Sequence, residues 1–75
     1  RIKVMLSNEP GALGDLSNLI ARQEANISNL NIVYRTLSYF EILIDLEVRD
    51  LEHLNLIIAA LKASKVVSYV SRAAQ

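Results

Sequence analysis

Apolar residues alternate, or recur every three to four positions, in a series of short segments along the chain. Residues 2–6 alternate, which predicts a strand with one buried face. Pro10 suits a first helical position, and apolar spacings of three and four then predict a helix to about Glu24. Alternation returns over 27–35 and predicts a second strand. The residues expected to point inward are Ile2, Val4 and Leu6, then Leu13, Leu16 and Ile20, then Leu30, Ile32 and Tyr34.

The second half of the chain continues with a turn, a strand, a helix and a strand. Residues 36–38 are turn candidates, and 40–48 then alternate more regularly than any other segment, with Glu41, Asp45 and Glu47 facing away. Asp50 can cap a second helix, because a short carboxylate accepts from the free N–H groups of a first turn. A last strand is expected over 66–71. The inward residues are predicted to be Phe40, Ile42, Ile44, Leu46 and Val48, then Leu51, Leu54, Ile58 and Leu61.

This order of elements predicts an α+β fold, the ferredoxin-like βαββαβ sandwich. Two strand–helix–strand halves with right-handed crossovers place the four strands in one antiparallel sheet of order 4-1-3-2, with both helices on one face. The other face of the sheet stays open. An apolar patch on that face would be covered by a second copy or another domain. The residues predicted for this interface are Met5, Val33, Leu43, Val67 and Tyr69.

Length, charge and cysteine content narrow the class of protein. The 75 residues form one domain, 1–75, and a chain that begins at Arg1 is expected to be cut from a longer protein. A domain this short buries only about 60% of the surface of its unfolded chain, so a partner would stabilise it. Zero net charge disfavours strong binding to nucleic acid or to a membrane. The lack of cysteine, of a membrane-length apolar run and of a signal peptide favours the cytoplasm.

The side chains that could carry out chemistry are few. His53 is the only histidine, and we expect it to be a solvated helix residue that faces away from the apolar stripe. Glu41, Asp45 and Glu47 share one side of a strand, but no convergent ligands from other strands are evident, so no metal site is predicted. The chain itself is therefore expected to be neither an enzyme nor a cofactor-binding protein.

Three functions known for small folds of this kind fit poorly. The glycines of the first loop have the spacing G-x-x-G without the lysine of a nucleotide-binding loop. Residues 7–16 include no arginine to hold the phosphate of an acyl phosphate, which disfavours an acyl-phosphate hydrolase. The outer faces of the central strands offer no aromatic side chain on which an RNA base could stack.

The stretch 8–14 holds both glycines and the only proline of the chain, between a strand and a helix. Free backbone N–H groups and the positive end of a helix dipole collect at such a place, and a carboxylate is stabilised there. Gly11 would let a ligand approach the backbone, and Asn8 offers a donor and an acceptor. The loop could hold the carboxylate and amine of a free amino acid, or it could be a tight turn that binds nothing.

The stretch NEPGALGDL resembles the N-x-P-G-x-L loop of ACT domains, and Ala25-Asn26-Ile27 is similar to the start of their second strand. The resemblance extends from Ile2 to Arg72. It implies a regulatory module that binds an amino acid between two copies of the domain. The positions that match the family's site are Asn8, Pro10, Gly11, Ala12 and Leu13 of one copy, with Asn26 and Ile27 of the other.

A narrower resemblance is carried by the run LEVRDLEHL, residues 46–54, which is similar to the C-terminal ACT domain of long RelA/SpoT proteins. Lys65 departs from it, since many relatives have a glycine there. The resemblance implies a parent GTP pyrophosphokinase or (p)ppGpp hydrolase, and a stringent-response module that senses amino-acid status through the ribosome. A branched-chain amino acid is the ligand that it implies. The alternative is a structural module for dimerisation or docking, without a small-molecule ligand.

Overall fold

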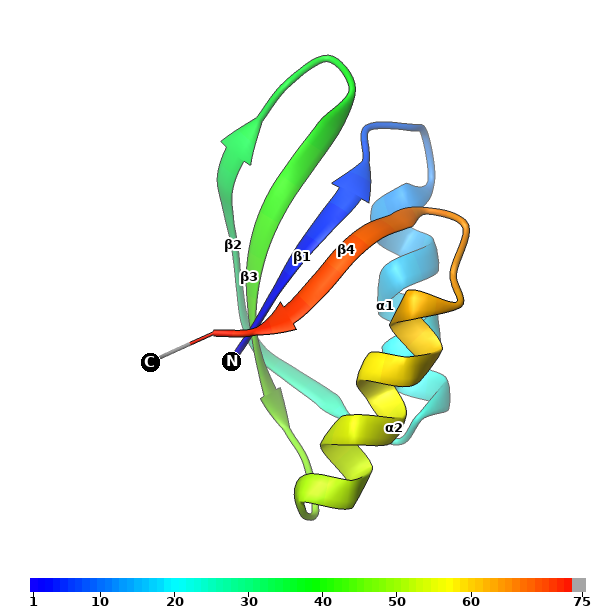
Figure 1. Cartoon of the computed structure of the whole chain (residues 1–75), viewed down its shortest axis with the longest axis vertical. Coiled ribbons are helices and arrows are strands. Elements are labelled where there is room, and N and C mark those ends of the chain that lie inside the picture. The colour runs from blue at the N-terminus through cyan, green and yellow to red at the C-terminus, as the bar shows by residue number, and fades with distance from the viewer. Residues whose placement is uncertain (74–75) are drawn as a thin grey trace.

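A computed structural model of the chain describes residues 1–73 and has the expected βαββαβ order (Figure 1). The turn at 36–38 is confirmed: Thr36 Oγ1 accepts from the backbone N–H groups of Ser38, at 3.1 Å, and of Tyr39, at 3.0 Å. The elements are β1 (Ile2–Ser7), α1 (Ala12–Arg22), β2 (Asn26–Arg35), β3 (Tyr39–Glu47), α2 (Leu51–Lys62) and β4 (Val67–Arg72).

The four strands form one antiparallel sheet in the order β2-β3-β1-β4, which confirms the expected topology. Both helices lie on one face of the sheet, and the other face carries none (Figure 1). The β1–α1 loop and the β2–β3 turn lie at one end of the sheet, while the α1–β2 and β3–α2 connections lie at the opposite end. The topology therefore separates two groups of loops by the length of a helix.

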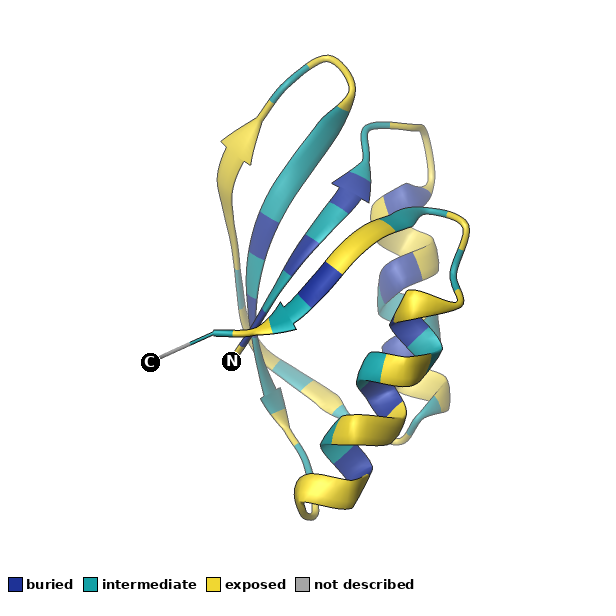
Figure 2. Cartoon of the chain, in the orientation of Figure 1, coloured by how far each residue is buried: buried dark blue, intermediate teal, exposed yellow. Residues whose placement is uncertain are grey.

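The hydrophobic core lies between the sheet and the helices, and the central strands supply much of it (Figure 2). The edge strand β2 has no fully buried residue. Alternation in β1 and β3 is confirmed, because every second residue of each central strand is fully buried over part of its length. The buried apolar residues are Ile2, Val4, Leu6, Ala12, Leu16, Ile20, Ile42, Ile44, Ile57, Leu61 and Val70.

The first helix begins later than its sequence pattern predicts. Pro10 lies in a turn, Gly11 is the N-cap with φ 84°, and α1 starts at Ala12, so the assignment of Pro10 to a first helical position is wrong. Ala12 is buried and Leu13 is 37% exposed, so the inward orientation predicted for Leu13 is wrong. The physical reason is the left-handed conformation of Gly11, which no helix residue can adopt, so the chain bends there before the helix begins.

In the second helix, the cap is confirmed and the inward stripe is partly wrong. The Asp50 side chain accepts from the His53 backbone N–H at 2.8 Å. The buried residues are His53, Ile57 and Leu61, whereas Leu51 is 57% exposed. The prediction of a solvated His53 is therefore wrong. Its ring is buried because both of its nitrogens find backbone partners.

Register shifts in the edge strands overturn two further orientations. In β2 the pairing shifts between Ile32 and Tyr34, so that Tyr34 pairs with Glu41 and faces the open side rather than the core. In β4 the strand begins at Val67, which pairs with Leu6 and packs against the core. The placement of Val67 on the open face is therefore wrong. A bulge leaves one residue unpaired, and the alternation beyond it reverses.

Candidate functional site

The start of α1 presents backbone N–H groups that have no hydrogen-bond partner among residues 1–73. Ala12 N donates to Glu9 O at 3.1 Å, and Asp15 N donates to Gly11 O at 2.9 Å. No side chain of the described residues caps the helix. Within residues 1–73, the N–H groups of Leu13 and Gly14 make no hydrogen bond to backbone or side chain. They lie at the positive end of the α1 dipole, where an anionic group such as a carboxylate is stabilised.

Asn8 connects this loop to the β2–β3 turn. Its Nδ2 donates to Thr36 O at 2.8 Å, and its backbone N donates to Ser38 O at 3.0 Å. One N–H of the side-chain amide is thus used within the fold, and Oδ1 is the atom that could accept from a ligand amine. Asn8 therefore has a structural role that sequence reasoning did not find.

The other loop positions differ in what they could offer. Pro10 and Gly11 are exposed, Leu13 is partly exposed, and Ala12 is buried, so Ala12 could offer only backbone atoms. A Cβ at Gly11 would meet nothing within 4 Å. Glycine is favoured at this position by its positive φ rather than by a crowded backbone.

Asn26 and Ile27 lie at the opposite end of the domain. α1 separates them from the loop, and its 11 residues span about 16 Å. Asn26 Nδ2 donates to Glu47 Oε1 at 3.0 Å, and the half-buried Ile27 pairs with Leu46 and packs against the core. One copy does not bring the two groups of predicted residues together, and no pocket is found within the described chain. A site that uses both groups has to be built by two copies.

The open face of the sheet mixes apolar and paired charged residues. Met5 lies between Glu41 of β3 and Tyr69 of β4, and Tyr69 is 53% exposed. Lys3, beside them in β1, pairs with Leu43 and forms an ion pair with Glu41 at 4.0 Å. These positions agree with the predicted phase for Met5, Leu43 and Tyr69, and a partner at this face stays a prediction.

Arg1 and Asp45 form the shortest ion pair of the described residues, 2.7 Å between Arg1 Nε and Asp45 Oδ1. The hydrogen bond from the guanidinium is the largest cause that lowers the pKa of Asp45, and the same bond raises the pKa of Arg1. Among residues 1–73, no group of three or more histidine, cysteine, aspartate or glutamate side chains gathers where a metal ion could bind.

The sequence pattern predicted that Val33 is exposed, but it missed the exposed apolar segment at the end of β2 to which Val33 belongs. Ile32 is 40% exposed, Val33 48%, Tyr34 55% and Leu37, in the turn, 97%. We call Ile32, Val33, Tyr34 and Leu37 the β2 edge patch. β2 is an edge strand, so its outer side also presents unpaired backbone groups to which another strand could bind. Three consecutive apolar residues, 32–34, were the signal in the sequence.

The fold places the chain in the class of small βαββαβ domains with both helices on one face of the sheet, and comparison with known families identifies the family. A family model described as "ACT domain" matches residues 1–72. The chain belongs to the ACT domain family, which confirms the resemblance read from its first loop. No helix among the described residues is long and apolar enough to cross a membrane.

Relatives agree with this assignment, and solved structures share the fold. The chain is 44% identical over 72 residues to "GTP pyrophosphokinase rsh" of Brucella ovis, and 43% identical to the same protein of Brucella abortus. These matches cover 96% of this chain and 10% of each relative. The crystal structure of the ACT domain from GTP pyrophosphokinase of Chlorobium tepidum matches 96% of this chain and 92% of its own, with a TM-score of 0.76 and 17% identity. A homoserine dehydrogenase from Thiobacillus denitrificans matches 95% of this chain and 16% of its own, with a TM-score of 0.69 and 23% identity.

Proposed function

We propose that this chain is a regulatory ACT domain that binds an amino acid between two of its copies. The observation that carries the proposal is the pair of unpartnered N–H groups, on Leu13 and Gly14, at the start of α1. A free amino acid would place its carboxylate on these groups, and its amine near Asn8 Oδ1. The start of β2 in the second copy, at Asn26 and Ile27, would close the site.

Two features of the single chain support a site shared between copies. The loop and the β2 start are separated by the length of α1, and no pocket is found within the described chain. The edge strand β2 also carries the β2 edge patch and unpaired backbone groups. Antiparallel pairing of two β2 edges would bury the patch and bring the β2 start of one copy toward the loop end of the other.

The parent of this domain is proposed from its relatives, of which it spans only a tenth. We propose a cytoplasmic GTP pyrophosphokinase or (p)ppGpp hydrolase in which this domain reports amino-acid status to a catalytic half elsewhere in the parent. A branched-chain amino acid and contacts with the ribosome are the ligand and the partner that the family resemblance implies. The chain itself is the regulatory part and performs no catalysis in this proposal.

A second candidate is a docking or dimerisation module without a small-molecule ligand. The observation that favours it is the hydrogen bond from Asn8 Nδ2 to Thr36 O, which gives Asn8 a structural purpose. In this case the loop is a tight turn, and the open face and the β2 edge patch are the functional surfaces.

A titration of the amide-labelled chain with valine, leucine and isoleucine distinguishes the two, with aspartate as a matched ligand control. Saturable shifts at residues 8–14 and at Asn26 and Ile27 support the amino-acid site. No shift at millimolar ligand contradicts it and favours the docking module. Sedimentation equilibrium of the same sample tests association, and a strict monomer at high concentration contradicts the shared site.

A Gly11→Asp variant adds a further test. Aspartate tolerates the left-handed conformation better than most residues, and its carboxylate would repel the ligand carboxylate. Asn18→Asp is the matched control, since it adds the same charge to an exposed position farther along α1. Loss of binding in the first variant only supports the site, and equal binding in both contradicts it.

A further inference from the structure

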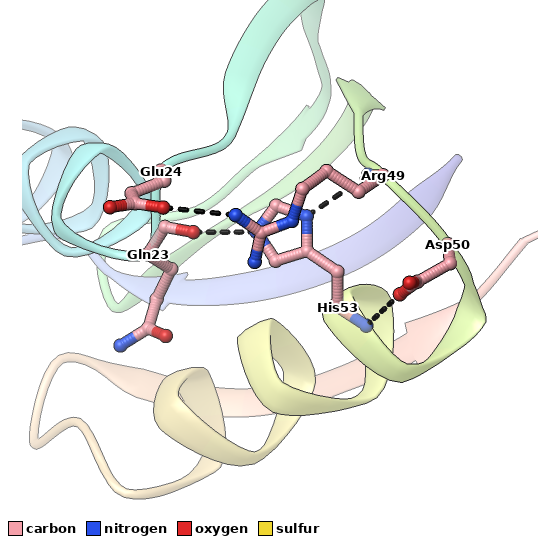
Figure 3. A network of polar contacts seen from close by, with 5 residues as sticks. All are labelled: Gln23, Glu24, Arg49, Asp50 and His53. Atoms are coloured by element: carbon pink, nitrogen blue, oxygen red, sulfur yellow. Dashed lines mark hydrogen bonds and ion pairs between the residues drawn. The ribbon is translucent and has the colours of Figure 1, made fainter.

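His53 is the one buried polar side chain among residues 1–73, with 3% of its surface exposed, and no function described above uses it. It lies in the first turn of α2, and its ring points toward the end of α1 (Figure 3). Nδ1 accepts from the Arg49 backbone N–H at 3.1 Å. A backbone N–H can only donate, so Nδ1 carries no hydrogen, and Nε2–H donates to the carbonyl oxygen of Gln23.

The carbonyl that His53 contacts belongs to the turn between α1 and β2. Glu24 N donates to Ala21 O at 3.0 Å, and Ala25 N donates to Ile20 O at 3.4 Å, which is the pattern of a Schellman motif. Glu24 occupies its left-handed position with φ 62°, where glycine is usual. Strained backbone of this kind persists only where the surroundings hold it in place.

Two contacts from the β3–α2 side hold this turn. One is the hydrogen bond from His53 to Gln23 O, and the other is the ion pair of 2.9 Å between Arg49 Nη1 and Glu24 Oε2 (Figure 3). The ion pair is solvent-exposed, with 64% and 75% of the two side chains accessible, so water weakens it. The buried contact of His53 is therefore the stronger restraint on the turn.

The turn leads directly into β2, whose first two residues pair with the end of β3: Asn26 with Glu47, and Ile27 with Leu46. Arg49 connects β3 to α2, and its backbone N–H donates to His53. The ring of His53 contacts Gln23, just before β2. The end of β3 and the start of β2 are therefore linked through His53 as well as by their pairing in the sheet. A displacement of the first turn of α2 would move Gln23 and, through it, the start of β2.

We infer that His53 is a positioning residue, which sets the place of Asn26 and Ile27 by its hydrogen bond to Gln23 O and couples them to the β3–α2 loop. This inference rests on the proposed function for the role of the β2 start, and it deepens that function. A partner that contacts the β3–α2 loop would change amino-acid binding through this histidine, although it contacts neither half of the site.

Two substitutions at His53 separate positioning from packing. His53→Gln keeps an amide nitrogen near the place of Nε2 and can donate to Gln23 O, but it loses the acceptor for Arg49 N. His53→Asn keeps an acceptor near the place of Nδ1 for Arg49 N, but it cannot reach Gln23 O. Each variant therefore gives up one of the two hydrogen bonds, and each removes the aromatic ring.

The measurement is amide hydrogen exchange, followed residue by residue by NMR in the unliganded 75-residue chain. We expect His53→Asn to accelerate exchange at residues 23–27 at least tenfold relative to His53→Gln, and His53→Gln to accelerate exchange at Arg49 instead. Equal acceleration at 23–27 in both variants, or none in either, overturns the inference. A uniform acceleration along the whole chain in both variants also overturns it, because it reports only a lower global stability.

A ligand titration of the same variants keeps this inference separate from the proposed function. If the wild-type chain binds valine, leucine or isoleucine, His53→Asn is expected to raise the Kd at least fivefold above that of His53→Gln. Equal Kd values in the two variants overturn the positioning role. If the wild-type chain binds none of them while the exchange pattern holds, the amino-acid site fails and the positioning of the β2 start stands.

Discussion

The two glycines, one at the N-cap of α1 and one in its first turn, should respond to the same substitution in opposite directions. Gly11 has φ 84°, a conformation in which an L-residue costs about 1–2 kcal/mol. A Cβ there would meet nothing within 4 Å, so no steric clash adds to this cost. Gly14 lies in the first turn of α1, where alanine is more favourable than glycine by up to about 1 kcal/mol, and its Cβ also meets nothing.

Gly11→Ala should therefore lower the free energy of unfolding by about 1–2 kcal/mol, and Gly14→Ala should raise it by up to about 1 kcal/mol. The expected separation between the two variants is about 1–3 kcal/mol, or roughly 4–24 °C in Tm for a domain of this size. Urea unfolding at one fixed protein concentration measures it, since any dimer would make the stability depend on concentration. If Gly11→Ala leaves the free energy of unfolding unchanged, the left-handed N-cap is refuted. The geometry that leaves the N–H groups of Leu13 and Gly14 without partners is then refuted as well.

Three further predictions concern the cap of α2, the β1–α1 loop and the ion pair between Arg1 and Asp45. Asp50→Ala removes the N-cap of α2 and should cost about 1 kcal/mol in urea unfolding, while Asp50→Asn should restore most of it. Asn8→Ala removes the hydrogen bond to Thr36 O and should cost about 0.5–1.5 kcal/mol, with faster amide exchange in the β2–β3 turn; unchanged exchange there would contradict the connection. The folded-state pKa of Asp45 is lowered, so its contribution to stability is present above the ordinary aspartate value of about 3.9 and is lost as the pH falls through the folded value. Asp45→Asn and Arg1→Ala should therefore each reduce the acid dependence of Tm below about pH 4, and an unchanged profile would contradict the pairing.

The order of elements and of strands could be predicted because each boundary has a local cause. Alternation of apolar residues identifies the central strands. Asp50 identifies the start of α2, because its side chain makes a capping hydrogen bond within the first turn of that helix. Because strand–helix–strand crossovers are right-handed, few strand orders are then possible for the sheet. These signals act over a few residues, so a single sequence is enough to read them.

The orientations that failed depend on distant parts of the chain. Tyr34 and Val67 lie beyond bulges, and neither bulge is marked by a glycine or a proline in its strand. His53 is buried because two backbone groups satisfy its ring: the Arg49 N–H donates to Nδ1, and the Gln23 carbonyl oxygen accepts from Nε2. Backbone groups are present at every residue, so such a partnership leaves no trace in the amino-acid sequence.

The sequence predicted where the candidate site lies along the chain, but not the conformation and hydrogen bonds of its residues. The concentration of glycine and proline indicated the loop, yet Gly11 proved to be required for its φ, and Asn8 proved to donate within the fold. Asn26 and Ile27 were named from the family resemblance, and their role at a shared site stays a prediction. The pattern of residues along one chain does not determine how two copies of the chain associate.

The two ends of the described chain lie next to each other, and this has a mechanical consequence. Ala73 N donates to Arg1 O at 2.9 Å, and Ile2 pairs with Arg72 where β1 begins and β4 ends. A tension applied to both ends would pull β4 away from β1 beginning at this end of the two strands. The hydrogen bonds between the strands would then break one after another, instead of all bearing the force together. The fold should therefore open under a low force, from β4 inward, while the β2–β3 hairpin is still intact.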